Sequence, residues 1–94
     1  MYFTVIEAVP EPNSDEAQKY AGSHVACWIN STDWKHARER AIALVAGAGW
    51  IMRNIVEEKE VTAESYALND TAMDHFEQAL TDQEVCVLYT FPKS

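Results

Sequence analysis

Apolar side chains occupy both the even and the odd positions of residues 2–9. Successive side chains of a β-strand point to opposite faces, so this segment is predicted to be a strand with two apolar faces. Glu7 interrupts one of them. A strand that is apolar on both sides is usually covered on both sides of its sheet. Pro10 and Pro12 cannot donate a backbone hydrogen bond and are predicted to end the strand.

Residues 23–30 form a second predicted strand, preceded by a short polar segment. That segment, residues 14–22, has the cap residue Ser14 at one end and Gly22 at the other, which is typical of a helical turn. The strand itself presents two sets of alternating side chains: Val25, Cys27 and Ile29 on one face, and His24, Ala26 and Trp28 on the other.

The main helix is predicted to follow Ser31 or Thr32, either of which caps its N-terminus. Its apolar stripe recurs at spacings of three and four residues: Trp34, Ala37, Ala41, Leu44 and Ala48. Small residues in the stripe let the helix lie close to a sheet, and Gly47 and Gly49 are predicted to end it. Trp34 and Trp50 are then expected to fix the two ends of the helix on the sheet.

The second half of the chain contains two further strands and a second helix. Residues 50–61 begin apolar and become acidic, a pattern typical of a strand that lies at an edge or extends beyond its sheet. Thr62 is predicted to cap a turn that carries Tyr66. A helix with Met73, Phe76 and Leu80 on one side is expected to start between residues 69 and 71, and residues 84–91 form the last strand.

These elements predict one domain of the α+β class, an α/β sandwich that spans residues 1–94, because a chain of 94 residues has room for a single core. Their order is β-β-α-β-α-β. We expect a four-stranded mixed sheet with both helices on one face, ferredoxin-like in general shape, and a parallel crossover between the second and third strands. The other face would remain apolar, which favours homodimerisation across it.

Charge and composition exclude several classes of function. Seven Lys and Arg stand against fifteen Asp and Glu, and the net charge of −8 repels nucleic-acid phosphates and anionic membranes. No apolar run approaches the roughly 20 residues that span a bilayer, and no secretory signal pattern is visible, so a cytoplasmic protein is expected. The acidity reflects solubility or, alternatively, a surface for a basic partner, to which Glu57, Glu58 and Glu60 would contribute.

Motifs for catalysis or cofactor binding are not found in the sequence. Cys27 and Cys86 lie within strand patterns, where buried thiols are inert, and a disulfide between them would require neighbouring strands with suitable Cβ geometry. His24 and Cys27 resemble a ligand pair but point to opposite faces of a strand. Zinc-binding, nucleotide-binding and serine-elbow motifs are absent. We therefore expect no metal, no cofactor and no catalytic residue.

Glu7, His24 and Trp28 are the candidate residues for a small-molecule site. Glu7 interrupts an apolar face and is the carboxylate best placed to act as an acid or base. The alternative is an ion pair with Arg53 or Lys59, or exposure at a sheet edge. Trp28 shares a face with His24, and aromatic side chains in such positions often line pockets or subunit interfaces.

Several short segments resemble small bacterial α+β proteins of unknown function. They are Cys27-Trp-Ile, Gly49-Trp50, Tyr66, His75-Phe-Glu-Gln-Ala-Leu80 and Leu88-Tyr-Thr-Phe-Pro92. The resemblance implies a compact bacterial domain and carries no activity.

Three hypotheses follow for the function of this acidic chain. The first is a non-enzymatic domain that acts through protein–protein contacts, as a homodimer. The second is an inhibitor of a basic partner, of the immunity or antitoxin type. The third is a small-molecule-binding protein with a site near Glu7, His24 and Trp28.

Overall fold

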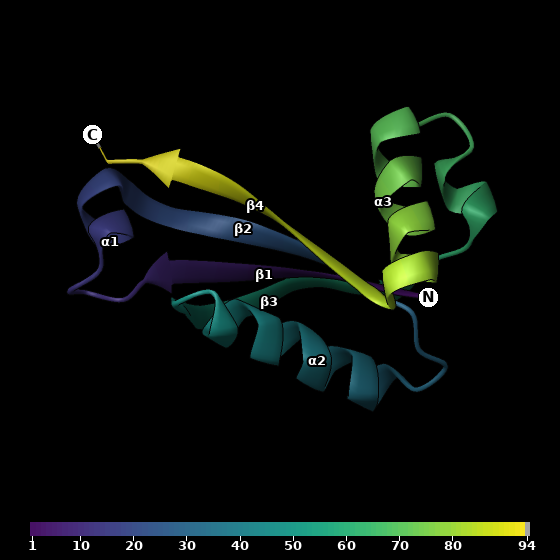
Figure 1. Cartoon of the computed structure of the whole chain (residues 1–94), viewed down its shortest axis with the longest axis horizontal. Coiled ribbons are helices and arrows are strands. Elements are labelled where there is room, and N and C mark those ends of the chain that lie inside the picture. The colour runs from purple at the N-terminus through teal and green to yellow at the C-terminus, as the bar shows by residue number, and fades with distance from the viewer. Residues whose placement is uncertain (94) are drawn as a thin grey trace.

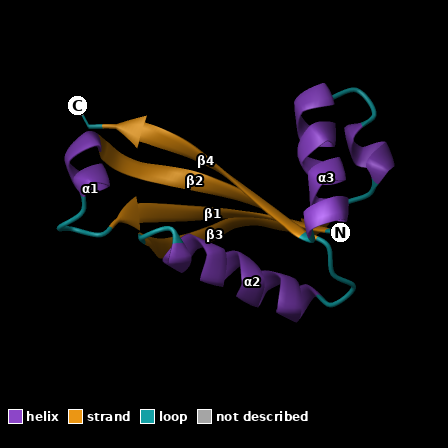
Figure 2. Cartoon of the chain, viewed as in Figure 1, coloured by secondary structure: helices purple, strands orange, loops and turns teal. Residues whose placement is uncertain are grey.

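The computed structural model describes residues 1–93 and has the α+β architecture predicted from the sequence (Figures 1 and 2). Its elements are β1 (Tyr2–Pro10), α1 (Asp15–Lys19), β2 (Tyr20–Ile29), α2 (Trp34–Gly47), β3 (Trp50–Glu60), the 3-10 helix η1 (Ala63–Tyr66), α3 (Asp70–Asp82) and β4 (Glu84–Pro92).

The four strands form one antiparallel sheet in the spatial order β3-β1-β2-β4. The prediction of a mixed sheet is therefore wrong. β2 and β3 do run parallel, because both are antiparallel to β1, but β1 lies between them. α2 thus crosses over one strand rather than connecting neighbours. The ferredoxin-like shape stays a prediction.

The helices lie on opposite faces of the sheet, and the prediction that both share one face is wrong (Figure 1). α2 covers the face of Ile6 and Cys27, whereas α3 packs near one end of the face of Phe3 and Trp28. The reason is visible at the end of β3. Val61 is buried in the second cluster, so the chain turns onto the second face before η1 begins.

The first face carries the tighter core. Ala37, Ala41 and Val45 of α2 are almost fully buried against β1 and β2, and their small side chains bring the helix close to the sheet. Trp50 is also buried there, as predicted. Trp34 is not. Its side chain is 44% exposed, because the buried stripe of α2 is centred on Ala41 and Val45 and leaves Trp34 outside the core.

Local signals set the ends of the helices. Ser14 caps α1 as predicted, and Asn69 caps α3, while α2 is capped by Asp33 rather than by Ser31 or Thr32. Thr62 and Ser65 form a capping box around η1, at the predicted turn. This turn places Tyr66 against the sheet, where it becomes part of the candidate site.

Candidate functional site

A cavity of about 520 Å³ lies between the second face of the sheet and the segment formed by η1 and α3. The sheet contributes seven side chains to it: Phe3, Val5, His24, Ala26, Trp28, Lys59 and Tyr89. The helical segment contributes five: Tyr66, Asn69, Thr71, Ala72 and His75. Small-molecule sites in proteins have this range of volumes and this mixture of apolar walls with a few polar groups. We call it the α3 cavity.

Trp28 forms the inner end of the α3 cavity, held by three aromatic neighbours. Only 3% of the residue is exposed. Its ring centroid lies 4.9 Å from that of Phe3 and 5.0 Å from that of His75, the latter at an interplanar angle of 34°. Tyr66 meets it edge-on at 6.5 Å. The segment formed by η1 and α3 therefore covers Trp28, which also lines the α3 cavity.

Tyr66 carries a hydroxyl with unused hydrogen-bonding capacity. Trp28 Nε1 donates to Tyr66 Oη at 3.0 Å, so this oxygen acts as an acceptor. A phenol can also donate its own proton. Within residues 1–93 we find no acceptor for that proton, which leaves it free to meet a group inside the α3 cavity.

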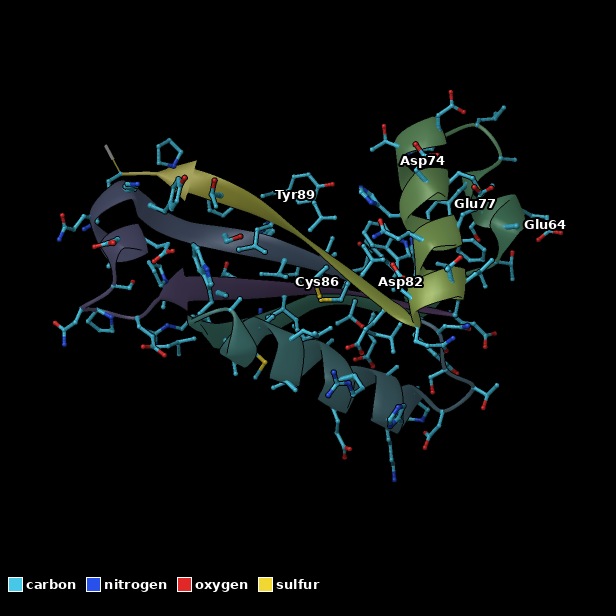
Figure 3. The ribbon with its side chains drawn as sticks, viewed as in Figure 1. Glu64, Asp74, Glu77, Asp82, Cys86 and Tyr89 are labelled. Atoms are coloured by element: carbon cyan, nitrogen blue, oxygen red, sulfur yellow. The ribbon has the colours of Figure 1, made fainter. Side chains whose placement is uncertain are left out.

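Within residues 1–93, no carboxylate lines the α3 cavity, although the chain contains fifteen Asp and Glu. The acidic side chains of the helical segment lie on its exposed outer surface, among them Glu64, Asp74, Glu77 and Asp82 (Figure 3). The cavity instead contains Lys59 and two of the three histidines. Its interior therefore differs in charge from the rest of the molecule.

Lys59 lines the α3 cavity and also forms an ion pair with a neighbouring carboxylate. Its Nζ atom lies 3.0 Å from Glu57 Oε1 and 5.7 Å from the centroid of the Phe3 ring. The hydrogen bond with Glu57 raises the pKa of Lys59 above its ordinary value of 10.5, which strengthens the preference of this side chain for the charged ammonium form. A ligand anion would thus compete with Glu57 for this cation.

The structure places all three residues of the predicted small-molecule site on the second face of the sheet, but they line two different hollows. His24 and Trp28 line the α3 cavity. Glu7 pairs with His24 across β1 and β2, but it is exposed and lines a smaller hollow beside Phe91. Ion pairs of Glu7 with Arg53 or Lys59 do not occur within residues 1–93.

The acidic run of β3 does not form one patch. Glu58 forms a bidentate pair with Arg38 of α2 on the first face, with two nitrogen–oxygen distances of 2.8 Å. Its neighbour Glu57 binds Lys59 on the second face. Glu60 is exposed, and burial of Tyr2, followed by the nearby charges of Glu60 and Asp33, raises the pKa of the Tyr2 phenol. An inhibitor surface to which these carboxylates contribute stays a prediction.

Metal ligands do not gather in the part of the chain that the structure describes: no three His, Cys, Asp or Glu side chains there are arranged to hold an ion. His24 and Cys27 point to opposite faces, as predicted. Across residues 1–93, every helix is too short or too polar to cross a membrane.

Protein-family models, curated proteins and solved structures gave no match to this chain. The resemblance to small bacterial proteins therefore stays a prediction, and the site must be interpreted from its own geometry.

Sequence reasoning missed the residues that close the α3 cavity, namely Lys59, Tyr66, His75 and Tyr89. Two features of the sequence indicated that the second face would be covered near these residues. The apolar odd-numbered face of the first strand requires a cover, and the capped turn at Thr62 places an aromatic side chain immediately before the second helix. Neither signal says which face that helix covers.

Proposed function

We propose that this chain binds a small aromatic molecule with a carboxylate or a similar anionic group in the α3 cavity. The observation that carries the proposal is an aromatic cavity of about 520 Å³ that no carboxylate of residues 1–93 lines, in a chain of net charge −8. This is the third of the functions expected from the sequence, with Glu7 replaced by Lys59 and Tyr66.

The walls of the cavity favour a planar, apolar ligand body. Phe3, Trp28 and His75 present rings that already pack on one another, and Val5 and Ala26 extend the apolar floor. Aromatic rings prefer offset or edge-to-face partners, and each such contact contributes about 0.5–1.5 kcal/mol beyond the burial of area. A planar ring therefore gains more here than a flexible aliphatic chain of equal area.

The polar groups of the cavity favour a hydrogen-bond acceptor on that ligand. Tyr66 has a free hydroxyl proton, and Lys59 Nζ, Thr71 and Tyr89 supply further donors. The net charge of the chain opposes anions only weakly at physiological salt, because exposed charges are screened beyond about 8 Å. The charge that a ligand meets inside the cavity is set by Lys59 and its partner Glu57.

Calorimetric titration with three naphthalene probes tests the proposal. Naphthoate, naphthamide and naphthylmethylammonium share one ring system and differ in charge. We expect naphthoate to bind about tenfold more tightly than the ammonium probe, a difference that one charge-assisted hydrogen bond supplies. Equal affinities, or no binding of any probe, would contradict the proposal.

Variants of the Lys59–Glu57 pair separate charge from shape. Lys59→Gln should weaken naphthoate binding, and Glu57→Gln should strengthen it, because the variant frees Lys59 from its competing partner. Naphthamide should respond to neither change. A cavity-filling variant, Ala72→Trp, should abolish binding of all probes, whereas Ala43→Trp on the exposed side of α2 should leave binding intact.

A second candidate is homodimerisation through the part of the second face that α3 leaves uncovered. Phe91 is 42% exposed, Tyr89 52% and Ile51 40%, and all three lie on this face. A homodimer would act through the protein–protein contacts expected from the sequence. Its location would be the cytoplasm, as the sequence also led us to expect. Exposed apolar groups of this size favour association with a second copy.

Light scattering coupled to size-exclusion chromatography tests the dimer. The wild-type chain should elute as a dimer at high micromolar concentration, and Phe91→Asp should convert it to a monomer. Leu68→Asp is the matched control, because Leu68 is fully exposed in the loop before α3 and away from the sheet. A wild-type monomer at that concentration would contradict the dimer and leave the ligand proposal in place.

A further inference from the structure

Cys27 and Cys86 are direct partners in the antiparallel pairing of β2 with β4. Their sulfur atoms lie 2.6 Å apart, and both thiols are free. Directly opposed residues of antiparallel strands have Cα atoms about 4.5–5.5 Å apart, which lies within the range that a disulfide spans. The two cysteines therefore lie on neighbouring strands, and their sulfur atoms are already close enough for a disulfide to form with only a small adjustment.

We propose that Cys27 and Cys86 form a reversible disulfide by exchange with low-molecular-weight disulfides, and that this bond locks the edge strand β4 to the centre of the sheet. The α3 cavity lies on the other face, so this site is independent of the proposed ligand.

The two thiols differ in exposure, and this difference sets the order of the reaction. Cys27 is fully buried beneath α2, whereas Cys86 lies partly exposed on β4 (Figure 3). The next residue on the same face, Leu88, is 39% exposed, so α2 leaves this edge of the sheet partly open. A small disulfide can thus reach Cys86 but not Cys27.

The hydrogen bond between the thiols reinforces the same order. Either thiol can donate in this contact, and the hydrogen bond with Cys27 lowers the pKa of Cys86, because an S–H group stabilises a neighbouring thiolate. The pKa of Cys27 is raised by this hydrogen bond and by burial. Cys86 is therefore the attacking group, since the thiolate is the nucleophile in exchange.

The reaction balances in two exchanges. The Cys86 thiolate attacks one sulfur of a disulfide R–S–S–R, forms a mixed disulfide and releases one R–S⁻. Cys27 then transfers its proton to the released thiolate and attacks Cys86 Sγ, which expels the second R–S⁻. This second R–S⁻ takes up from water the proton that Cys86 gave to water when its thiolate formed. The two protein thiols are oxidised, and one molecule of R–S–S–R is reduced to two thiols.

Intact mass spectrometry of the full chain tests this order with oxidised glutathione as the probe. The reduced wild-type chain is exposed to the probe under native conditions, quenched with acid and alkylated. We expect a product that has lost two hydrogen atoms and carries neither glutathione nor alkyl groups. Reduced glutathione in excess should restore two alkylatable thiols. A wild-type product with glutathione attached, or with both thiols still alkylated, would overturn the proposal.

Single variants identify the attacking sulfur. Cys27→Ala should accumulate a stable glutathione adduct at Cys86, and Cys86→Ala should form its adduct at least about tenfold more slowly, because a buried thiol reacts only after local opening. Equal rates in the two variants would contradict the assigned order. If either variant fails to fold by circular dichroism, the rate of wild-type glutathionylation, mapped by peptide mass spectrometry at short times, decides between the two sulfurs.

Discussion

At the scale of single residues, the hydrogen bond from Trp28 to Tyr66 links a central strand to the segment that covers it. Trp28 has one polar atom, and burial of an indole N–H without an acceptor is unfavourable. Tyr66 supplies that acceptor across 38 positions of sequence. The bond therefore fixes η1 on the sheet and at the same time holds Tyr66 in the wall of the α3 cavity.

Tyr66→Phe removes this acceptor and leaves Trp28 Nε1 buried without a partner. We expect the free energy of unfolding to fall by about 1–3 kcal/mol. Urea denaturation of the wild type and the variant measures the difference. Tyr89→Phe is the matched control, because Tyr89 is 52% exposed, and it should change stability by less than about 0.5 kcal/mol. A similar loss in both variants would contradict the role given to Tyr66.

Predictions from the sequence at this scale succeeded where a residue's own strand pattern decides its environment. The faces assigned to Cys27 and Trp28 are those of the structure. Trp34 shows the opposite case. A helical stripe can be drawn through it, but the helix packs with Ala41 at its centre, and Arg38 stacks on the Trp34 ring at 4.7 Å instead. Which of two adjacent stripes faces a sheet depends on the partner, which the helix sequence does not contain.

At the scale of elements, two bidentate ion pairs connect α2 to the edges of the sheet. Arg38 binds Glu58 of β3, and Arg40 binds Glu84 of β4. The helix is thereby tied to both edge strands while its small residues pack over the centre. Each pair is partly exposed, so its contribution is reduced by solvent screening.

The two pairs predict a pH dependence of stability. Hydrogen bonds from the arginines lower the pKa of Glu58 and of Glu84 below the ordinary value of 4.5. A carboxyl with a lowered folded pKa stabilises the fold above the unfolded pKa, and this stabilisation is lost as pH falls through the folded value. Unfolding free energy should therefore decrease between about pH 5 and about pH 3.

Substitution of both arginines isolates this effect. The double variant Arg38→Gln/Arg40→Gln should lose less stability over the acidic range than the wild type, and added salt should reduce the difference. Arg53→Gln is the control, because Arg53 is exposed and forms no ion pair within residues 1–93. If the free energy of unfolding falls equally with pH in the wild type and in the double variant, the ion pairs do not contribute.

The turn between α3 and β4 contains a backbone position that favours glycine. Gln83 has φ 75°, in the left-handed region, where a Cβ atom costs about 1–2 kcal/mol. Gln83→Gly should therefore stabilise the fold by about 1 kcal/mol, less the entropy that glycine gains on unfolding.

Thermal or urea unfolding measures this gain. Gln78→Gly, on an exposed position in the same helix, should instead destabilise the fold by about 1 kcal/mol. If both substitutions lower stability equally, Gln83 is not strained.

At the scale of the whole molecule, the α3 cavity arises because one face of the sheet is covered over only part of its length. α2 runs along the first face, whereas α3 contacts β2 and β4 near one end of the second (Figure 1). The rings of Phe3 and Trp28 lie under this short cover, and the space beside them remains open. The cavity is thus a consequence of topology rather than of a sequence motif.

This explains how far the sequence could predict the molecule. Each element was predicted to within a few residues, because periodicity and caps are local. The order of the strands and the faces of the helices depend on pairings such as Cys27 with Cys86 and on the turn at Val61. These contacts join distant segments, so the candidate site could be anticipated only at His24 and Trp28.

The central claim, that the α3 cavity binds an aromatic anion, is tested most directly by nuclear magnetic resonance of the three indole N–H groups during titration with naphthoate. Trp28 borders the cavity, whereas Trp34 is exposed on α2 and Trp50 is buried on the first face. We predict that the Trp28 resonance shifts in a saturable manner and that the other two remain in place. An unchanged Trp28 resonance, or equal shifts of all three, would contradict the claim.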